Sequence, residues 1–380
     1  MEKQRMPKKP NLTAIELFAG IGGFRIACDE LGIKTVWAND MKKDACGVYR
    51  KRFGSKEMVE GDIKSLKSVI PSDFDILTGG FPCQPFSGAG KKKGVFDVRG
   101  TLFRDIKEIV QKRKPKAFIL ENVKRILGMQ KGGTFKTILT ELSNLNYQIE
   151  WRIVNVRSFG LPQNRERILI IGIRDDVLSK NQILHDVEAT NYSKLKGVKT
   201  SKLEEHEGTF SFWGRIEGEN VIEQELESKV SDFGDAKLKD HLQPPSEVSD
   251  KFDFTESTIE RLGGNTPRNK FVHGVEILSN QEGGRRMGYT IFGENGIAPT
   301  LTATTSRIYE RYKIGEVYRI LTNVEYGRLQ GFEDDHCDHM IIGGNAEMLS
   351  PYKQYPLYGN AIPPHLAKWG LQIVVSQINN

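Results

Sequence analysis

The residue of this chain best suited to chemistry is Cys83, in the stretch Gly79-Gly80-Phe81-Pro82-Cys83-Gln84-Pro85-Phe86-Ser87. An apolar run, Asp75–Thr78, precedes this stretch, and its glycines and prolines prevent both helix formation and regular strand pairing. Open α/β sheets bind their ligands at the carboxyl ends of strands, which is where this thiol is expected. Taken alone, the stretch leaves two interpretations open, a buried structural cysteine or a nucleophile at a rigid turn.

A glycine-rich turn, Phe18-Ala19-Gly20-Ile21-Gly22-Gly23-Phe24, follows the first apolar run. Glycines at a strand-to-helix turn let a ligand approach the backbone closely. The dinucleotide-binding fingerprint requires Gly or Ala at its sixth position, and counted from Gly20 that position holds Arg25. The turn therefore favours a nucleoside without a pyrophosphate, and a dehydrogenase is excluded.

Two acidic residues follow the next predicted strands. Asp40 ends the second strand, where a carboxylate accepts hydrogen bonds from ribose hydroxyls, and Asp62 follows a third strand, where it is expected to bind an adenine amino group. Each acid is equally typical of a turn or a helix cap. Together with the glycine turn, the two acids predict an adenosyl cofactor.

The composition is that of a globular protein without a membrane span. The 380 residues are 38% hydrophobic and 27% charged, with a formal net charge of +6, which is compatible with nucleic acid binding but does not establish it. No apolar run reaches the ~20 residues that cross a bilayer. The amino terminus is charged and is not a secretory signal, and the four cysteines show no paired spacing, which predicts a reducing cytoplasm.

The first half of the chain alternates apolar, strand-like runs with amphipathic, helix-like stretches. This order predicts an α/β fold with a doubly wound, mostly parallel sheet. Strands are expected at Leu12–Phe18, Thr35–Ala38, Asp75–Thr78, Lys116–Leu120, Tyr147–Val156 and Arg167–Ile173. Helices are expected at Gly22–Leu31, Lys42–Phe53, Thr101–Lys112 and Thr134–Leu145.

The alternation stops near Asp176, where the chain becomes polar and rich in turns. We expect a catalytic and cofactor-binding domain over residues 1–175, completed by residues 351–380, because Pro364–Ile378 is an apolar helix able to pack on the first domain. Residues 176–350 are expected to form a smaller, irregular domain that includes a hinge. The segment His336–His339 has metal-binding residue types but no second ligand pair at zinc spacing, so we interpret it as a surface turn and expect no metal.

Six motifs in order make the chain resemble the cytosine-5 DNA methyltransferases of bacterial restriction–modification systems. They are Phe18–Gly23, Phe81-Pro82-Cys83-Gln84, Glu121-Asn122-Val123, Gln163-Asn164-Arg165-Glu166-Arg167, the segment Arg319–Thr322 with Glu325 and Arg328–Phe332, and Gly359-Asn360-Ala361. Three positions depart from the commonest family pattern, namely Ile320, Glu333 and Ala361. The form of the Phe81–Gln84 motif favours the DNA branch of the family over the RNA branch.

The resemblance implies an S-adenosylmethionine-dependent methyltransferase fold, with a target-recognition domain in the region after residue 176. It implies that the Cys83 thiolate adds to C6 of a flipped-out cytosine in a short duplex site and activates C5. Glu121 is expected to protonate or bind N3, and Arg165 to hold O2. The alternatives are a strand-end turn for Glu121 and a solvated basic turn for Arg165 and Arg167.

The resemblance also assigns binding residues. Cofactor binding is expected from Phe18, Gly20, Gly22, Gly23, Asp40, Met41, Asp62, Ile63, Pro82, Leu102 and Asn360. DNA contacts are expected from Gln84, Ser87, Lys91, Lys92, Arg99, Arg167, Arg285, Arg286, Thr300 and Thr302, of which Arg285 and Arg286 are candidates for reading guanine.

Three functions remain open at this point: a DNA methyltransferase, an RNA cytosine-5 methyltransferase, and a catalytically silent DNA-binding regulator. The regulator would have lost Cys83, Glu121 or Arg165, and all three are present. The partner is therefore expected to be double-stranded DNA, with a restriction endonuclease as a functional counterpart. The resemblance alone implies a monomer in the bacterial cytoplasm, and the recognition sequence does not follow from the residues.

Overall fold

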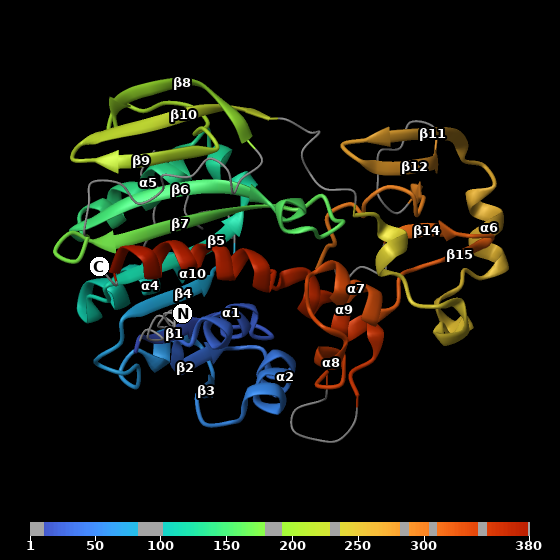
Figure 1. The fold of residues 1–380 in the computed structure, drawn as a ribbon, viewed down its shortest axis with the longest axis horizontal. Helices are drawn as coiled ribbons and strands as arrows, with labels where there is room; N and C mark the ends of the chain where they lie inside the picture. The colour runs from blue at the N-terminus through green and yellow to red at the C-terminus, as the bar shows by residue number, and fades with distance from the viewer. Residues whose placement is uncertain are drawn as a thin grey trace, which may run out of the picture.

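The structure is a computed structural model, and it describes residues 11–82, 102–178, 192–228, 236–281, 289–303, 310–340 and 348–378. It contains a large body built on a ten-stranded sheet and a smaller body built on a five-stranded sheet, which lie side by side (Figure 1). None of the described helices is long and apolar enough to span a membrane.

The first half of the large sheet consists of parallel strands. In spatial order these are β3 (Met58–Glu60), β2 (Lys34–Asp40), β1 (Thr13–Leu17), β4 (Ile76–Gly80) and β5 (Ala117–Val123). Their central members are apolar and buried on both faces, as parallel strands covered by helices must be. The expected α/β class is confirmed, and the carboxyl ends of β1, β4 and β5 meet at one edge.

The second half of the same sheet is antiparallel. Its strands, in spatial order from β5, are β7 (Glu166–Arg174), β6 (Tyr147–Asn155), β9 (Trp213–Glu217), β10 (Asn220–Ser228) and β8 (Tyr192–Lys202). Residues 192–228, which the sequence assigned to the second domain, thus extend the first sheet. Their alternation of polar and apolar residues gave little strand signal, because one face of this antiparallel half meets water.

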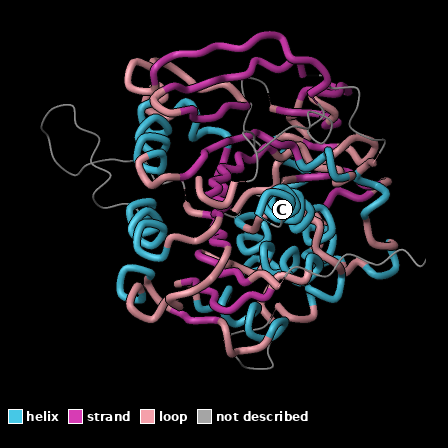
Figure 2. The backbone as a smooth tube through the Cα atoms, turned by 60° about the vertical axis from the view of Figure 1, so that its left-hand side comes forward, coloured by secondary structure: helices cyan, strands magenta, loops and turns pink. Residues whose placement is uncertain are grey.

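Helices cover both faces of the large sheet, as the view in Figure 2 shows. One face carries α3 (Ile63–Leu66), α4 (Leu102–Arg113), α5 (Gly133–Ser143) and the 3-10 turn η1 (Lys124–Gly128), which share one apolar cluster. The other face carries α1 (Gly23–Leu31) and α10 (Pro364–Ile378), which share another. Helix α2 (Lys43–Phe53) flanks β2 and β3, and the short turn η2 (Val156–Phe159) follows β6. The last helix of the chain therefore packs on the first domain, beside α1 (Figure 1).

The smaller body contains the second sheet and short helices. Its strands are β11 (Thr266–Val272), β12 (Val275–Asn280), β13 (Ile291–Phe292), β14 (Arg311–Ile314) and β15 (Val317–Arg319). Its helices and turns are η5 (Leu238–His241), η6 (Pro245–Glu247), η7 (Asp250–Phe252), α6 (Glu256–Leu262), α7 (Asn323–Leu329), α8 (Asp334–Cys337) and α9 (Pro351–Asn360). A capping box fixes the start of α7, where Thr322 and Glu325 bond reciprocally and Arg319 pairs with Glu325 at 2.7 Å.

The segment His336–His339 differs from the expected surface turn. Helix α8 buries His336 completely, and the exposed fraction of Cys337 is only 5%. The His336 ring packs 4.6 Å from the Phe332 ring, and burial lowers the pKa of His336 to about 3. The Cys337 Sγ atom lies 2.9 Å from the Tyr358 hydroxyl. The polar residue types of this segment gave no sign of burial. His336 and Cys337 are buried because α8 packs against Tyr358 of α9.

We predict that Gly172→Ala destabilises the large sheet. Gly172 lies opposite Phe118 across β7 and β5, and a Cβ atom at Gly172 would lie 2.1 Å from a carbon of the buried Phe118 ring. Displacing that ring should lower the free energy of unfolding by about 1–3 kcal/mol. Urea denaturation measures the change.

Gly197→Ala in β8 is the matched control, because a Cβ atom at Gly197 meets nothing within 4 Å. Equal stability of the two variants would contradict the proposed packing of Phe118 on Gly172.

Candidate active site

A pocket of about 310 Å³ lies at the carboxyl ends of β1, β4 and β5, and we call it the strand-end pocket. It brings together residues from seven separate segments of the chain. Among the described residues it is lined by Phe18, Ala19, Gly20, Phe24, Asp40, Met41, Lys42, Ala45, Gly80, Phe81, Pro82, Leu102, Glu121, Asn122, Val123, Arg167, Leu357, Gly359, Asn360, Ala361 and Ile362. Predicted cofactor residues and the predicted acid Glu121 therefore share one cavity.

The glycine turn after β1 is held open towards this pocket. Gly20 has a left-handed φ of 57°, and a Cβ atom at that position would meet nothing within 4 Å. The Asp40 carboxylate accepts hydrogen bonds from the backbone N–H groups of Gly20 at 2.9 Å and Lys42 at 2.8 Å. Asp40 thus fixes two backbone turns while lining the pocket, a combination suited to holding a nucleoside.

The other two glycines of the turn serve packing. A Cβ atom at Gly22 would lie 2.3 Å from the Phe53 ring, and one at Gly23 would lie 2.2 Å from the Ile362 carbonyl oxygen. Neither glycine lines the strand-end pocket. Their expected direct contact with a cofactor is therefore not supported by the geometry.

Asp62 and Ile63 also lie outside the described lining of the pocket. Asp62 caps α3, since its carboxylate accepts a hydrogen bond from the Lys64 backbone N–H at 3.0 Å, and it remains exposed. Ile63 is 2% exposed and belongs to the main apolar cluster. The alternative interpretation of Asp62, a helix cap, describes its observed bonding.

The register of β4 and β5 places the predicted nucleophile motif beside Glu121. Gly80 pairs with Glu121, and the Asn122 side chain donates a hydrogen bond to the Phe81 carbonyl at 3.0 Å. Asn122 thereby holds the chain two residues before Cys83. Cys83 lies outside the described residues, so the structure describes the approach to the thiol and not the thiol itself.

Glu121 is a buried carboxyl group with one charged partner. It is 8% exposed, and its Oε1 atom lies 3.0 Å from Nε of Arg167. Burial raises the pKa of the Glu121 carboxyl above its ordinary value, and the charges of Arg167 and Arg165 oppose that rise. A carboxyl with a raised pKa can carry a proton near neutral pH and donate it to a substrate nitrogen.

The structure places the two arginines of the Gln163–Arg167 motif differently from the expectation. Arg165 is 1% exposed and donates to the carbonyl oxygens of Leu301 at 3.1 Å, Gly359 at 2.9 Å and Ala361 at 3.0 Å. Its guanidinium thus bonds backbone carbonyl groups of the protein, and Arg165 does not line the strand-end pocket. Arg167, expected to contact DNA, is the arginine that lines the pocket beside Glu121.

The position at which β7 begins explains why the two arginines point to different places. Arg165 precedes the strand and points into the junction with the smaller body, whereas Arg167 lies in β7 opposite Val123 and reaches the end of β5. Side chains two residues apart share a face only when both lie in a regular strand. The sequence motif contains both arginines, but it does not indicate that β7 begins between them, at Glu166.

Arg165 also positions Asn360, a predicted cofactor residue. The carbonyl groups it binds, those of Gly359 and Ala361, flank Asn360 at the end of α9, and all three residues line the strand-end pocket. The departure from the family pattern at Ala361 is compatible with this role, because only its backbone oxygen is used. Sequence reasoning missed this function of Arg165 because its partners lie far along the chain.

The predicted DNA contacts are only partly within the described residues. Gln84, Ser87, Lys91, Lys92, Arg99, Arg285 and Arg286 lie outside them. The Thr300 hydroxyl donates to the Asn164 carbonyl, and the Thr302 hydroxyl bonds Glu310. These two threonines therefore hold the segment that joins the smaller body to the motif around Arg165, and their geometry does not favour base readout.

Comparison of the sequence with known protein families gives one match that covers most of the chain. The sequence model described as C-5 cytosine-specific DNA methylase matches residues 12–372. The chain belongs to this family. The methylase carries out the DNA (cytosine-5)-methyltransferase reaction, in which a methyl group is added to carbon 5 of cytosine.

Individual relatives cover nearly the whole methylase. It is 34% identical over 343 residues to the type II methyltransferase M.HpaII of Haemophilus parainfluenzae, covering 81% of this chain and 93% of the relative. It is 31% identical over 375 residues to M.HhaI of Haemophilus parahaemolyticus, covering 97% of this chain and 95% of the relative. Both lines of evidence confirm the resemblance drawn from the six motifs.

The fold is shared with more distant proteins. The crystal structure of the S. pombe Dnmt2 methyltransferase matches with a TM-score of 0.64 and 17% identity, covering 97% of this chain and 100% of that chain. A mutant of Spodoptera frugiperda DNMT2 matches with a TM-score of 0.63 and 17% identity, covering 96% of this chain and 99% of that chain. At this identity the comparison shows the fold alone.

We predict that Arg165→Lys destabilises the methylase. A lysine ammonium cannot reproduce the planar fork that reaches Leu301 on one side and residues 359 and 361 on the other. Buried carbonyl groups would lose their donors, and the free energy of unfolding should fall by about 2–4 kcal/mol, as urea denaturation can measure.

Arg104→Lys is the control for this prediction, because Arg104 is exposed and pairs with Glu108 one helical turn away. If both variants unfold at the same urea concentration, Arg165 does not hold the junction.

Proposed function

We propose that this methylase modifies a cytosine flipped out of a short, specific duplex site, through a covalent bond between the Cys83 sulfur and C6. The observation that carries the proposal is the shared pocket, in which a buried carboxyl group, Glu121, lies between the glycine turn and Arg167. A flipped base is required because C6 is inaccessible inside a stacked duplex.

The strand-end pocket fits S-adenosylmethionine. Gly20 offers a backbone that a ligand can approach, Phe18 and Phe24 offer apolar surfaces, and Asp40 and Met41 line the same side. Pro82, Leu102 and Asn360 would complete the binding site from the nucleophile motif, α4 and the end of α9. When bound, this cofactor supplies an electrophilic methyl group.

The residues of the chain account for activation of the base. Addition of the Cys83 thiolate to C6 forms a carbon–sulfur bond and moves an electron pair towards N3 and O2. Glu121, whose pKa burial raises, donates a proton to N3 in this proposal. We assign the O2 contact to Arg167, in place of Arg165, because Arg167 is the guanidinium that lies in the pocket.

Restoration of the aromatic ring then requires loss of the proton on C5, with water as the base, and expulsion of Cys83 as a thiolate. The Glu121 carboxylate left by the first step recovers its proton as N3 loses it. Arg167, 3.0 Å from Glu121 Oε1, stabilises the carboxylate in that interval.

The smaller body is proposed to select the target sequence, and residues 192–228 are left out of it because they belong to the large sheet. The biological role that fits best is protection of host DNA in the bacterial cytoplasm beside a restriction endonuclease. The named relatives M.HpaII and M.HhaI are type II methyltransferases, which supports this role.

We predict methyl transfer from labelled S-adenosylmethionine to unmethylated duplex DNA, at C5 of cytosine in one short sequence context. Bisulfite sequencing of the product locates the methyl group. Cys83→Ser should abolish transfer, since a hydroxyl group is far less nucleophilic than a thiolate at neutral pH.

Cys28→Ser is the control, because Cys28 is buried in α1 outside the lining of the strand-end pocket, and burial raises the pKa of its thiol. Transfer to structured RNA without transfer to duplex DNA would contradict the proposal and favour the RNA branch. Binding of duplex DNA without transfer to either would favour a silent regulator.

We predict that kcat/KM falls as the pH rises through the raised pKa of Glu121, because only the protonated carboxyl donates to N3. Ionisation of the Cys83 thiol gives the opposite slope, so the wild-type profile is bell-shaped. In Glu121→Gln the alkaline limb should disappear, because an amide does not titrate, and kcat should fall by about 10²–10⁴-fold.

Initial rates across a pH series measure both effects. Glu150→Gln is the control, because Glu150 is a buried carboxyl on β6 that bonds Trp213 away from the pocket. An alkaline limb that persists in Glu121→Gln would show that another group supplies the proton.

A further inference from the structure

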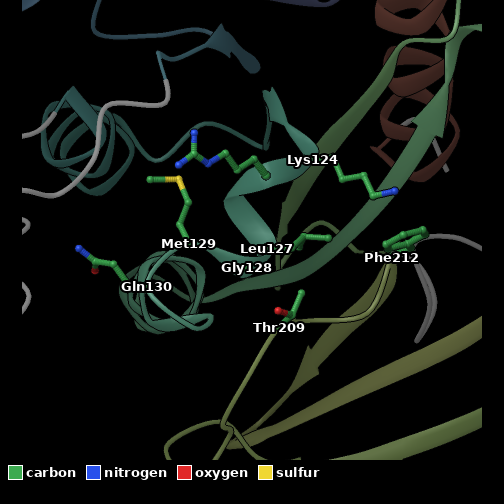
Figure 3. Close-up of a pocket in the computed structure, with 8 residues that line it drawn as sticks. Lys124, Leu127, Gly128, Met129, Gln130, Thr209 and Phe212 are labelled. Carbon is green, nitrogen blue, oxygen red and sulfur yellow. The ribbon is translucent and has the colours of Figure 1, made fainter. Parts of the chain in front are cut away.

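A second pocket, of about 530 Å³, lies beside the turn η1, which follows the catalytic strand β5 directly. We call it the η1 pocket. It is lined by Lys124, Arg125, Leu127, Gly128, Met129, Gln130, Thr209 and Phe212. Figure 3 shows Lys124 and Phe212 close together at one end, Met129 and Gln130 at the other, and Thr209 below Gly128. The mechanism above uses none of these side chains.

The wall formed by residues 203–212, between β8 and β9, is fixed in place by the rest of the large body. Phe210 donates a backbone hydrogen bond to the Leu127 carbonyl at 3.3 Å, and the Trp151 indole donates to the Ser211 carbonyl at 3.0 Å. His206 lies 2.9 Å from Glu223 on β10, and Lys136 donates to the His206 carbonyl at 3.1 Å. The η1 pocket is therefore preformed, and a ligand would not have to order it.

Strand register places the η1 pocket on the same edge of the sheet as the active site. Asn122 lies opposite Ile168, and Ile168 lies opposite Ile153. Ile153 in turn donates a backbone hydrogen bond to the Phe212 carbonyl at 2.7 Å. Three strand spacings of about 4.8 Å separate Phe212 from Asn122, or about 14 Å. A rise of about 3.4 Å per base pair makes this distance equivalent to about four base pairs of duplex.

The lining combines cations with apolar surface. The Lys124 ammonium lies 4.0 Å from the centre of the Phe212 ring and 2.9 Å from the Glu166 carboxylate, and its side chain is 36% exposed. Arg125 is exposed, and no carboxylate among the described residues pairs with it. The two cations outnumber the one carboxylate, so the pocket is complementary to an anion that also carries an apolar ring.

We propose that the η1 pocket binds the sugar–phosphate backbone of the substrate duplex about four base pairs from the target cytosine. This inference rests on the proposed function. Arg125 and Lys124 would contact a phosphate, while Phe212 would pack against the adjoining deoxyribose. Such a contact positions the duplex without reading its sequence. It gives the additional strands β8 to β10 a role in substrate binding, because they carry the wall with Thr209 and Phe212.

The test uses the duplex site found by bisulfite sequencing, in a long form with ten base pairs on each side of the site and a short form that ends three base pairs from the target cytosine. Fluorescence anisotropy measures the dissociation constant of each form over a series of salt concentrations. Arg125→Ala should weaken binding of the long duplex on the order of tenfold and lower the salt slope by about one. Arg125→Lys should recover most of the affinity, and the short duplex should bind wild type and Arg125→Ala equally.

Lys112→Ala is the charge-matched control, because Lys112 is exposed at the end of α4, on the opposite edge of the sheet, and should leave both dissociation constants unchanged. Neutral methylphosphonate substitutions give a second measurement. Neutralising the phosphates about four base pairs from the cytosine on one side should weaken wild type and leave Arg125→Ala unaffected.

Equal affinity of Arg125→Ala and wild type for the long duplex would overturn the proposal, and so would an equal loss on both duplexes. Methyl transfer by wild type to the long duplex reports on the proposed function separately. If that transfer occurs while the flanking effect is absent, only the η1 pocket assignment fails.

Discussion

The buried guanidinium of Arg165 is the interaction on which the rest of the site depends. Three carbonyl groups from two distant segments accept its hydrogen bonds, and burial lowers its pKa well below the ordinary value for arginine. Breaking such a buried, charge-assisted set is costly, on the order of 3–5 kcal/mol, because the remaining groups lose their partners. The junction between the large sheet, the segment around Leu301 and the end of α9 is therefore fixed by one side chain.

That junction has a direct consequence for the strand-end pocket. Asn360 lies between the two carbonyl groups of residues 359 and 361 that Arg165 holds, so the far wall of the pocket is set by a residue that does not line it. Gly359 must be a glycine there, because a Cβ atom would lie 2.6 Å from the Thr302 carbonyl oxygen. The packing of the segment around Leu301 against the end of α9 therefore also determines the shape of the strand-end pocket.

The large sheet fixes the spacing between the site residues that lie along one of its edges. The carboxyl ends of β2, β4 and β5 bring Asp40, Phe81 and Glu121 within one cavity. The register row of Asn122 continues through Ile168 and Ile153 to Phe212. Elements that carry chemistry and elements that bind an extended substrate can therefore share one rigid edge. The pocket at η1 follows from this arrangement because β9 adds to β6 at the corresponding register.

The sequence by itself determined the α/β class, the parallel half of the large sheet, the glycine turn, and Glu121 as a strand-end acid, because each depends on local pattern and motif order. It also determined the family, through six motifs in sequence. Only the tertiary structure decided which arginine meets Glu121, since that choice depends on where β7 begins and on carbonyl groups more than a hundred residues away. It likewise decided that residues 192–228 join the first sheet and that His336 is buried, because edge pairing and helix packing leave no clear trace in a polar sequence.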